Sequence, residues 1–241
     1  QFRTFEIQQR CKDGRLVWGE VLAKVDRNEQ GVIVGYHGIT RNITERKRLE
    51  AQIRQLAFHD TLTQLANRRL LLEHLDQAMG ASKRSGHFGA LLYLDLDNFK
   101  ALNDRLGHIV GDTALAEAAD ALKRIFRNAD AVGRFGGDEF CVFAMGITRN
   151  AIAARAESVL QALSMHFEQD GKAVDITASI GIYVFDGSET SYEDALQKAD
   201  NAQYRAKQLG KNRYVFHDDP LTAEELAAAQ LRGDDLDGFG F

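Results

Sequence analysis

The first forty residues alternate between apolar and polar positions, and a period of two is typical of strands with one buried face. Three such stretches occur, at residues 2–7, 15–21 and 32–36. Asp13-Gly14 separates the first two, where a tight hairpin turn is expected. The pattern predicts three antiparallel strands, which would be marginally stable on their own.

A charged helix is predicted directly after these strands. Asn42 is followed three residues later by Glu45, which is a capping-box arrangement. Leu49, Ile53 and Leu56 then recur at spacings of four and three residues, and such a seam is typical of a helix that pairs with another helix. A helix lying on its own domain would show the same pattern, because the repeat is too short to identify a coiled coil.

From residue 88 onward, strand-like and helix-like periods alternate. The expected strands are 89–94, 131–135, 139–145, 174–185 and 213–216, and the expected helices are 98–106, 112–126, 149–165 and 191–209. Gly136-Gly137 marks a hairpin turn between two of the strands. The order β-α-α-β-β-α-β-α-β predicts an α+β fold with a mainly antiparallel sheet and helices packed on it.

Composition narrows the functional class only in part. The 241 residues include 30 Lys and Arg against 35 Asp and Glu, and this net charge of -5 argues against nucleic acid as a partner. Cys11 and Cys141 have no paired spacing, which favours a reducing, cytoplasmic location. No apolar run approaches the ~20 residues of a membrane span. We expect a fragment, whose full-length form could be anchored in a membrane upstream.

Two acidic segments carry the candidate chemistry. Asp95 and Asp97 end an apolar strand, where a carboxylate beside a free carbonyl can bind Mg²⁺, although acids at strand ends are more often turn formers. Asp138 and Glu139 follow the paired glycines, which permit a tight turn and the approach of a bulky anion. Adjacent carboxylates repel each other unless a cation lies near. If the two segments converge in the folded chain, their carboxylates would form a site for paired metal ions of the kind that supports phosphoryl transfer.

The glycine hairpin reads Arg134-Phe135-Gly136-Gly137-Asp138-Glu139-Phe140. Further motifs are Asp60-x-Leu62-Thr63-x-Leu65-x-Asn67-Arg68-Arg69, Asp95-Leu96-Asp97-x-Phe99-Lys100, Asn103-Asp104, Gly107-His108, Gly111-Asp112, Ser179-Ile180-Gly181, Ala199-Asp200, Tyr204-x-Ala206-Lys207 and Gly210-Lys211-Asn212. In this order they resemble the motifs of GGDEF-domain diguanylate cyclases over about two-thirds of the chain. The resemblance implies a fold similar to the palm of nucleotide polymerases and cyclases. Such domains bind GTP without a P-loop, and the chain contains no P-loop pattern.

The resemblance also implies roles for the matching residues. The metal-binding groups would be Asp95, the Leu96 carbonyl, Asp138 and Glu139, with two Mg²⁺ or Mn²⁺ ions per GTP. The catalytic residues would be Asp138, Glu139 and Lys100, and which of the two acids accepts the 3′-hydroxyl proton stays open. The other substrate-binding residues would be Asn103, His108, Asp112, Gly136, Gly137, Lys207 and Lys211. An Asp carboxylate can accept two hydrogen bonds from guanine that adenine cannot supply.

In this family each monomer carries half of an active site. The resemblance implies a homodimer, held through the linker helix and the catalytic faces, that joins two GTP into cyclic di-GMP and releases pyrophosphate. A helix seam at Leu49, Ile53 and Leu56 would raise the effective concentration of the two domains. Arg127 and Asp130 match an inhibitory site for the product, although a bare R-x-x-D is common at helix ends.

Residues 12–18 and 38–47 resemble the closing half of a PAS domain, with Asn42 in place of the usual Asp. The expected organisation is a partial PAS domain at 1–41, a linker helix at 42–58, a catalytic domain at 59–217 and a flexible acidic tail at 218–241. An upstream sensor would then regulate the cyclase.

Three positions depart from the family pattern, namely Gln64, Ala66 and Asn201, and none touches the proposed chemistry. Two alternatives were weighed against an active cyclase: a catalytically silent GGDEF domain that acts as a receptor for GTP or cyclic di-GMP, and a dimerising adaptor. The intact signature speaks against the first. The presence of Asp95, Lys100 and Asp112 speaks against the second.

Overall fold

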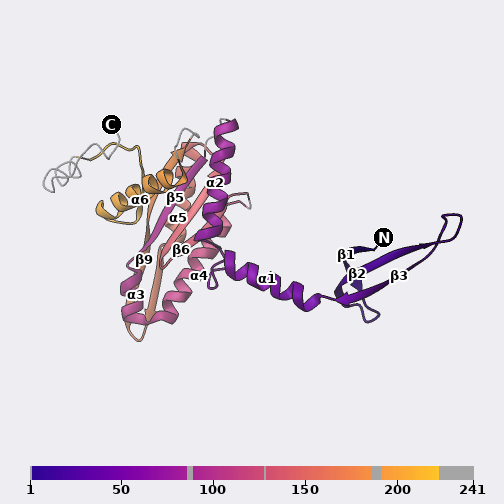
Figure 1. Cartoon of the computed structure of the whole chain (residues 1–241). Coiled ribbons are helices and arrows are strands. Elements are labelled where there is room, and N and C mark those ends of the chain that lie inside the picture. Colours follow the sequence, from indigo (N-terminus) through magenta and orange to yellow (C-terminus); the bar gives the residue numbers. More distant parts are fainter. Residues whose placement is uncertain (1, 86–88, 128, 186–190, 223–241) are drawn as a thin grey trace. The chain divides into compact units, whose positions relative to one another are not determined.

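The computed structural model describes residues 2–85, 89–127, 129–185 and 191–222 (Figure 1). The chain divides into two compact units, residues 1–57 and 58–241. Within the described ranges, no helix combines the length and the apolar character needed to cross a membrane.

The first unit holds the three predicted strands, β1 (Arg3–Arg10), β2 (Leu16–Arg27) and β3 (Ile33–Asn42), which pair antiparallel in the order β1-β2-β3. Helix α1 (Thr44–Phe58) follows at once, because the Asn42 side chain accepts a hydrogen bond from the Thr44 amide at 2.9 Å. The capping-box bond that the sequence predicts to Glu45 is therefore replaced by one to Thr44. No residue of α1 is buried.

The second unit is built on one mixed sheet with strand order β10-β9-β5-β7-β6-β4, and β8 pairs with β9. The strands are β4 (Ala66–Asn67), β5 (Gly89–Asp97), β6 (Ala131–Gly136), β7 (Glu139–Met145), β8 (Met165–Gln169), β9 (Lys172–Phe185) and β10 (Arg213–Phe216). Only β10 with β9 and β4 with β6 pair in parallel, so the predicted mainly antiparallel sheet is confirmed.

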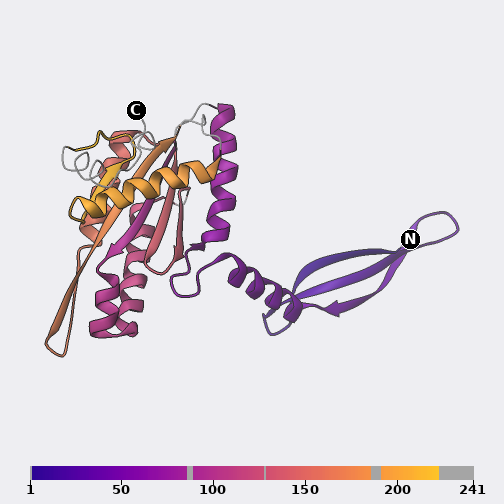
Figure 2. The ribbon, with the colours of Figure 1, turned by 60° about the vertical axis from the view of Figure 1, so that its left-hand side comes forward.

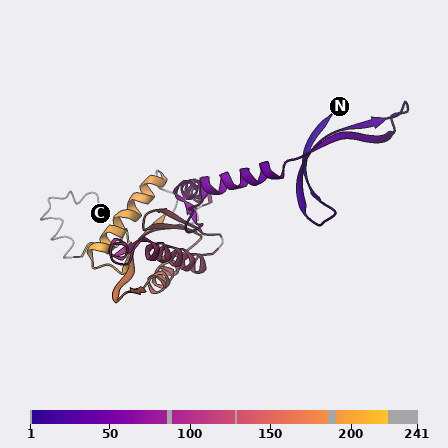
Figure 3. The same ribbon diagram turned by 90° about the horizontal axis from the view of Figure 1, so that it is seen from below.

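Helices cover both faces of this sheet (Figure 2). They are α2 (Arg68–Ser85), α3 (Phe99–Leu106), α4 (His108–Ile125), α5 (Arg149–Ala162) and α6 (Tyr192–Gln208). Alternate residues of β5 enter two different cores, since successive side chains of a strand point to opposite faces. Leu92 and Leu94 pack with α4 and α5, whereas Leu91 packs with α2 and α6. Figure 3 shows the same layers from below.

Three elements differ from the sequence prediction. Helix α2 was not predicted, although Leu71, Leu75 and Met79 recur every four residues and are buried. The helix expected at 149–165 ends at Ala162, because Met165 begins β8 and pairs with Ile176 of β9. The helix expected from 112 begins at His108. In the second case strand pairing with a distant segment overrides the local helical pattern.

Two arginines hold the described C-terminal end of the second unit. The Arg149 guanidinium contacts Asp218 and Asp219 at 2.6 Å, and buried Arg205 donates to the carbonyl of Asp219 at 3.1 Å. The predicted tail thus begins with residues bound to the domain. The rest of it, residues 223–241, lies outside the described part of the chain.

Helix α6 lies directly on the backbone of β9 at Gly181. A Cβ at this position would come within 2.0 Å of the Ala199 carbonyl oxygen and 2.2 Å of the Gln203 amide nitrogen. Both neighbours are helix backbone, so the helix as a whole would have to move. Gly181 therefore sets how closely α6 approaches the sheet.

We predict that Gly181→Ala lowers the free energy of unfolding by about 2 kcal/mol or more, because overpacking forces backbone shifts. Urea denaturation measures the change. Ile180→Val, at the neighbouring buried position, is the control and should cost only about 1 kcal/mol. Equal stability of Gly181→Ala and the native chain would contradict this account of the helix packing.

Candidate active site

The two acidic segments meet at one edge of the sheet, as the sequence predicts. Strand β5 pairs with β7 so that Asp95 lies opposite Glu139. The Leu96 amide donates to the Asp138 carbonyl at 3.2 Å, which places the hairpin beside the end of β5. Asp95, Leu96, Asp138 and Glu139 are therefore neighbours in space.

Asp95 is a largely buried carboxylate with one cationic partner. Its side chain is 13% exposed, and its Oδ2 lies 2.7 Å from Nζ of Lys207 on α6. Burial raises the pKa of Asp95 to about 6, and the charge of Asp138 adds to this effect while the Lys207 ammonium opposes it. The ion pair with Lys207 therefore offsets only part of the cost of burying the Asp95 charge.

The hairpin that carries the second pair of acids is braced by Arg134. Gly136 and Gly137 have φ values of 146° and 54°, which side chains rarely adopt. Arg134 donates to the Gly137 carbonyl from Nε at 3.0 Å and from Nη2 at 2.7 Å. Its Nη1 reaches Asp60 Oδ1 at 3.1 Å. The guanidinium therefore joins the turn to the segment that follows α1.

Asp60 is held in its charged form. Burial favours the neutral acid, but hydrogen bonds from Thr63 and Arg134 outweigh it and lower the pKa of Asp60. The Thr63 amide and hydroxyl donate to Oδ1 at 2.9 and 2.7 Å. The motif residues Asp60 and Thr63, to which the sequence assigned no role, support the Gly-Gly hairpin.

Tyr93 is a further residue that sequence reasoning missed. It lies on β5 two residues before Asp95 and packs edge-on against Phe135, with ring centroids 5.7 Å apart. Burial, together with the nearby charge of Glu139, raises the pKa of the Tyr93 phenol. The hydroxyl is therefore a neutral group beside the second acid of the hairpin.

The predicted guanine-contacting residues lie on α3 and α4, which follow β5. The backbone of Gly111 lies against the Asn103 side chain so closely that a Cβ there would be 2.0 Å from Oδ1. Asn103 therefore lies beside Asp112, the next residue of α4. His108 begins α4, and both it and Asp112 are exposed.

Three lysines surround the acids from different elements. Lys100 is exposed in the first turn of α3, shortly after β5. Lys207 pairs with Asp95, as described above. Lys211 follows α6, and its Nζ donates to Asn98 Oδ1 at 3.0 Å. This arrangement can receive a polyanion at the end of β5.

The side-chain and backbone oxygens at the end of β5 and on the hairpin are of the type that binds a divalent cation. No group of three or more His, Cys, Asp or Glu side chains within the described ranges is gathered tightly enough to hold a metal ion. The Lys207 ammonium, however, already provides a positive charge against Asp95, and carboxylate and carbonyl oxygens are the ligands that Mg²⁺ prefers.

A protein-family model described as "Diguanylate cyclase, GGDEF domain" matches residues 57–213. The chain belongs to the GGDEF family.

Relatives agree with this assignment. MucR of Pseudomonas aeruginosa, a bifunctional diguanylate cyclase/cyclic di-GMP phosphodiesterase, is 36% identical over 191 residues, which cover 79% of this chain and 28% of MucR. The diguanylate cyclase DgcP of the same organism is 39% identical over 163 residues, or 66% of this chain and 24% of DgcP. The chain thus spans about a quarter of the length of these curated relatives.

A crystal structure of the coiled coil and GGDEF domain of DgcB from Caulobacter crescentus, in complex with c-di-GMP, has the same fold. Its TM-score is 0.66 at 30% identity, with coverage of 71% of this chain and 91% of that chain. The α+β fold class predicted from the sequence is therefore confirmed.

The predicted product site lies between α4 and β6 of the GGDEF domain. Arg127 is exposed, and its amide donates to Asp130 Oδ2 at 3.0 Å. The Asp130 side chain is only 5% exposed, and Arg155 of α5 contacts the same oxygen at 2.7 Å. Asp130 is thus already paired, and Arg155 is a third charged group at this place that the sequence pattern did not indicate.

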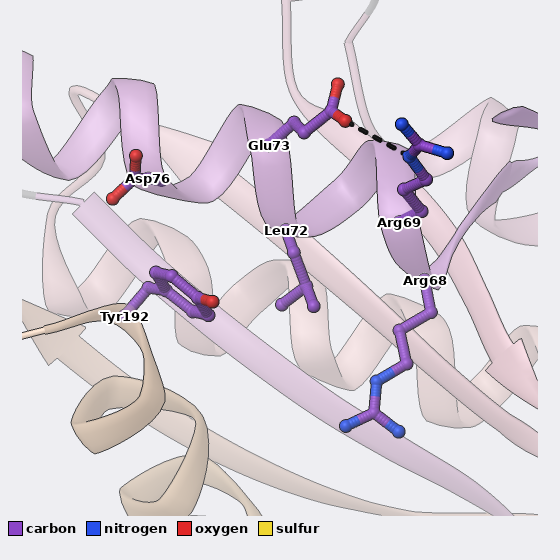
Figure 4. A pocket seen from close by; sticks show the side chains of 6 residues that line it. All are labelled: Arg68, Arg69, Leu72, Glu73, Asp76 and Tyr192. Carbon is purple, nitrogen blue, oxygen red and sulfur yellow. Dashed lines mark hydrogen bonds and ion pairs between the residues drawn. The ribbon is translucent and has the colours of Figure 1, made fainter.

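A hollow of about 550 Å³ lies elsewhere on the GGDEF domain, between α2 and the start of α6 (Figure 4). Its lining residues are Arg68, Arg69, Leu72, Glu73, Asp76 and Tyr192. None of them belongs to the predicted site. The Arg68 guanidinium lies over Phe135, at 5.3 Å from the ring centroid, so one wall of the hollow contacts the base of the Gly-Gly hairpin.

The raised pKa of Asp95 predicts a pH-dependent stability in metal-free protein. Because the folded state holds this proton up to about pH 6 and the unfolded chain only up to about pH 4, the free energy of unfolding falls as the pH rises through this interval. Asp95→Asn removes the buried charge and should stabilise the metal-free domain at pH 7.5 by up to about 3 kcal/mol.

Chemical denaturation in EDTA at pH 4 and pH 7.5 measures this effect. Asp104→Asn, at an exposed acid on α3, is the control and should change little. A destabilised Asp95→Asn variant at pH 7.5 would show instead that the ion pair with Lys207 outweighs burial.

Proposed function

We propose that the chain is an active diguanylate cyclase, which condenses two GTP into cyclic di-GMP and two pyrophosphate. One observation carries this proposal, namely that the two acidic segments of the family motifs are adjacent. Asp95 lies opposite Glu139, and the Leu96 amide donates a hydrogen bond to the Asp138 carbonyl. This convergence of the two acidic segments supports the roles that the family resemblance assigns to them.

Mg²⁺ or Mn²⁺, bound by Asp95, the Leu96 carbonyl, Asp138 and Glu139, would supply Lewis-acid stabilisation of the phosphate charge and lower the pKa of the attacking hydroxyl. The protein offsets part of the same charge with its own residues. Lys207 is poised to exchange its contact with Asp95 for the triphosphate when a cation takes its place. Lys100, in the first turn of α3, and Lys211, whose Nζ donates to Asn98, neutralise the leaving pyrophosphate.

The reaction forms a bond from the 3′-oxygen of one GTP to the α-phosphorus of the other. The bond between that phosphorus and its β-bridging oxygen breaks, and pyrophosphate leaves. Asp138 or Glu139 accepts the hydroxyl proton. Repetition of the step with the roles of the two nucleotides exchanged closes the ring. Asn103 and Asp112 select guanine, because the carboxylate accepts from its N1–H and N2–H₂ groups.

A second copy of the chain is required, because one domain binds one GTP. Helix α1 supports this part of the proposal, since Leu49, Ile53 and Leu56 are 49%, 66% and 65% exposed. A seam of apolar side chains without cover on its own unit is suited to pairing with an identical helix. We further propose that residues 1–41 belong to a PAS domain that regulates this cytoplasmic dimer.

We predict that the native chain converts GTP to cyclic di-GMP in the presence of Mg²⁺, and that Asp138→Ala and Glu139→Ala each lose at least about 100-fold in rate. The nucleotides are separated by chromatography and identified by mass. Glu117→Ala, at an exposed acid on α4, is the control and should keep the native rate.

The dependence on protein concentration tests the dimer. Catalysis between two chains predicts a rate that rises more steeply than linearly at low concentration. Absence of product at every concentration, together with binding of GTP or cyclic di-GMP, would replace the cyclase by a nucleotide receptor.

Product inhibition is a separate prediction. Arg127→Ala should leave turnover within about twofold but abolish inhibition by cyclic di-GMP, because the exposed guanidinium is the phosphate-binding group of that site. Initial rates with added cyclic di-GMP measure it, and Arg124→Ala, also exposed near the end of α4, is the control. Inhibition that persists in Arg127→Ala would refute the product site.

A further inference from the structure

Asp97 is an acid of the site for which the proposed reaction has no use. It ends β5, two residues after Asp95, and is only 2% exposed. Its Oδ1 accepts from the Ser179 hydroxyl at 2.8 Å, and its Oδ2 accepts from the Thr177 hydroxyl at 2.7 Å. A buried carboxylate needs such donors, and here the protein itself supplies them.

A third bond connects Asp97 to the loop after α6. The Asn212 amide donates to Asp97 Oδ2 at 3.2 Å. Lys211 and Asn212 have φ values of 64° and 45°, a left-handed conformation that persists in non-glycine residues only where the surroundings hold it. Asp97 is part of what holds this loop.

Asn98 secures the side chain of the same loop. Its Oδ1 accepts from Lys211 Nζ at 3.0 Å, and its Nδ2 donates to the Asp175 carbonyl at 3.2 Å. Asn98 is itself left-handed, with a φ of 64°. Two consecutive residues at the end of the metal-binding strand therefore hold the backbone and the ammonium group of the Lys211 loop.

We propose that Asp97 and Asn98 are positioning residues that set Lys211 for the phosphates of GTP. The inference rests on the proposed function, since it assigns the triphosphate to this end of the strand. A lysine is a flexible point charge, so fixing its stem before the nucleotide arrives reduces the ordering cost of binding. Hydrogen bonds to Asp97 and Asn98 then tie the loop to the strand that carries Asp95, and they set the position of the lysine relative to that acid.

Asn98→Gly gives the cleanest test. Glycine tolerates the left-handed backbone but removes both side-chain bonds at an exposed position, so the variant should fold. We expect the affinity for a GTP analogue with an α,β-methylene bridge, measured by calorimetry with Mg²⁺, to fall about three- to tenfold. The KM for GTP should rise accordingly, with kcat unchanged.

Substitutions at the buried acid provide the matched series. Asp97→Ala should weaken binding by at least as much as Asn98→Gly. Asp97→Asn keeps an oxygen for the Asn212 amide and should restore affinity to within about twofold. Ser179→Ala removes only a sheet-side bond of the same carboxylate, so it should lower the melting temperature without changing the affinity.

Measuring the affinity change of Asn98→Gly in a chain that also carries Lys211→Ala shows whether Asn98 acts by positioning the lysine. If Asn98 acts by placing Lys211, then Asn98→Gly has no further effect on affinity once Lys211 is removed, since coupled residues are not additive. An equal loss in both backgrounds, or native affinity in Asn98→Gly, overturns the inference. Failure of the native chain itself to bind the analogue would instead refute the proposed function.

Discussion

Negative charge gathered at one edge of the sheet is the constraint on which the site depends. Two unit charges 4 Å apart interact by about 1 kcal/mol in water but by about 4 kcal/mol near a protein surface. Asp95, Asp97, Asp138 and Glu139 would therefore oppose folding unless each had a partner. The chain supplies different partners to different acids, and the contrast is clearest between Asp97 and Asp95.

The Asp97 carboxylate accepts hydrogen bonds from two hydroxyl groups of its own sheet and from an amide of the Lys211 loop, so the protein itself supplies its polar partners. Asp95 has only the Lys207 ammonium, and its raised pKa shows that this is insufficient. Asp95 and Asp97 lie on the same face of one strand, but they differ in how completely the protein compensates the burial of their carboxylates. The incompletely compensated one is where an added cation lowers the energy most.

The sequence predicts the convergence of the acids because it is a local property of two segments. A strand ending in Asp95 and a Gly-Gly hairpin leading to Asp138 are both readable without knowledge of the rest of the chain. The hydrogen-bond donors to Asp97 cannot be predicted from local sequence. Thr177 and Ser179 lie 80 and 82 residues from Asp97, and only the pairing of β5 with β9 brings them together.

The same distinction explains the errors in secondary structure. The spacing of Leu71, Leu75 and Met79 indicates helix α2, which was not predicted. The end of α5 could not be predicted in this way, because nothing in residues 163–167 interrupts a helical pattern. Strand β8 forms there by pairing with β9. The contact of Arg155 with Asp130, at the predicted product site, also could not be predicted locally, since the two residues are 25 positions apart in the sequence.

The hairpin is tied to the residues that follow α1. Helix α1 ends at Phe58, and Asp60 follows two residues later. Asp60 accepts from Nη1 of Arg134, while Nε and Nη2 of the same guanidinium donate to the Gly137 carbonyl. Because a guanidinium presents its donors in a planar, rigid fork, one side chain fixes the turn relative to Asp60. The turn leads directly to Asp138, so a contact 74 residues apart in the sequence helps to position the acids of the hairpin.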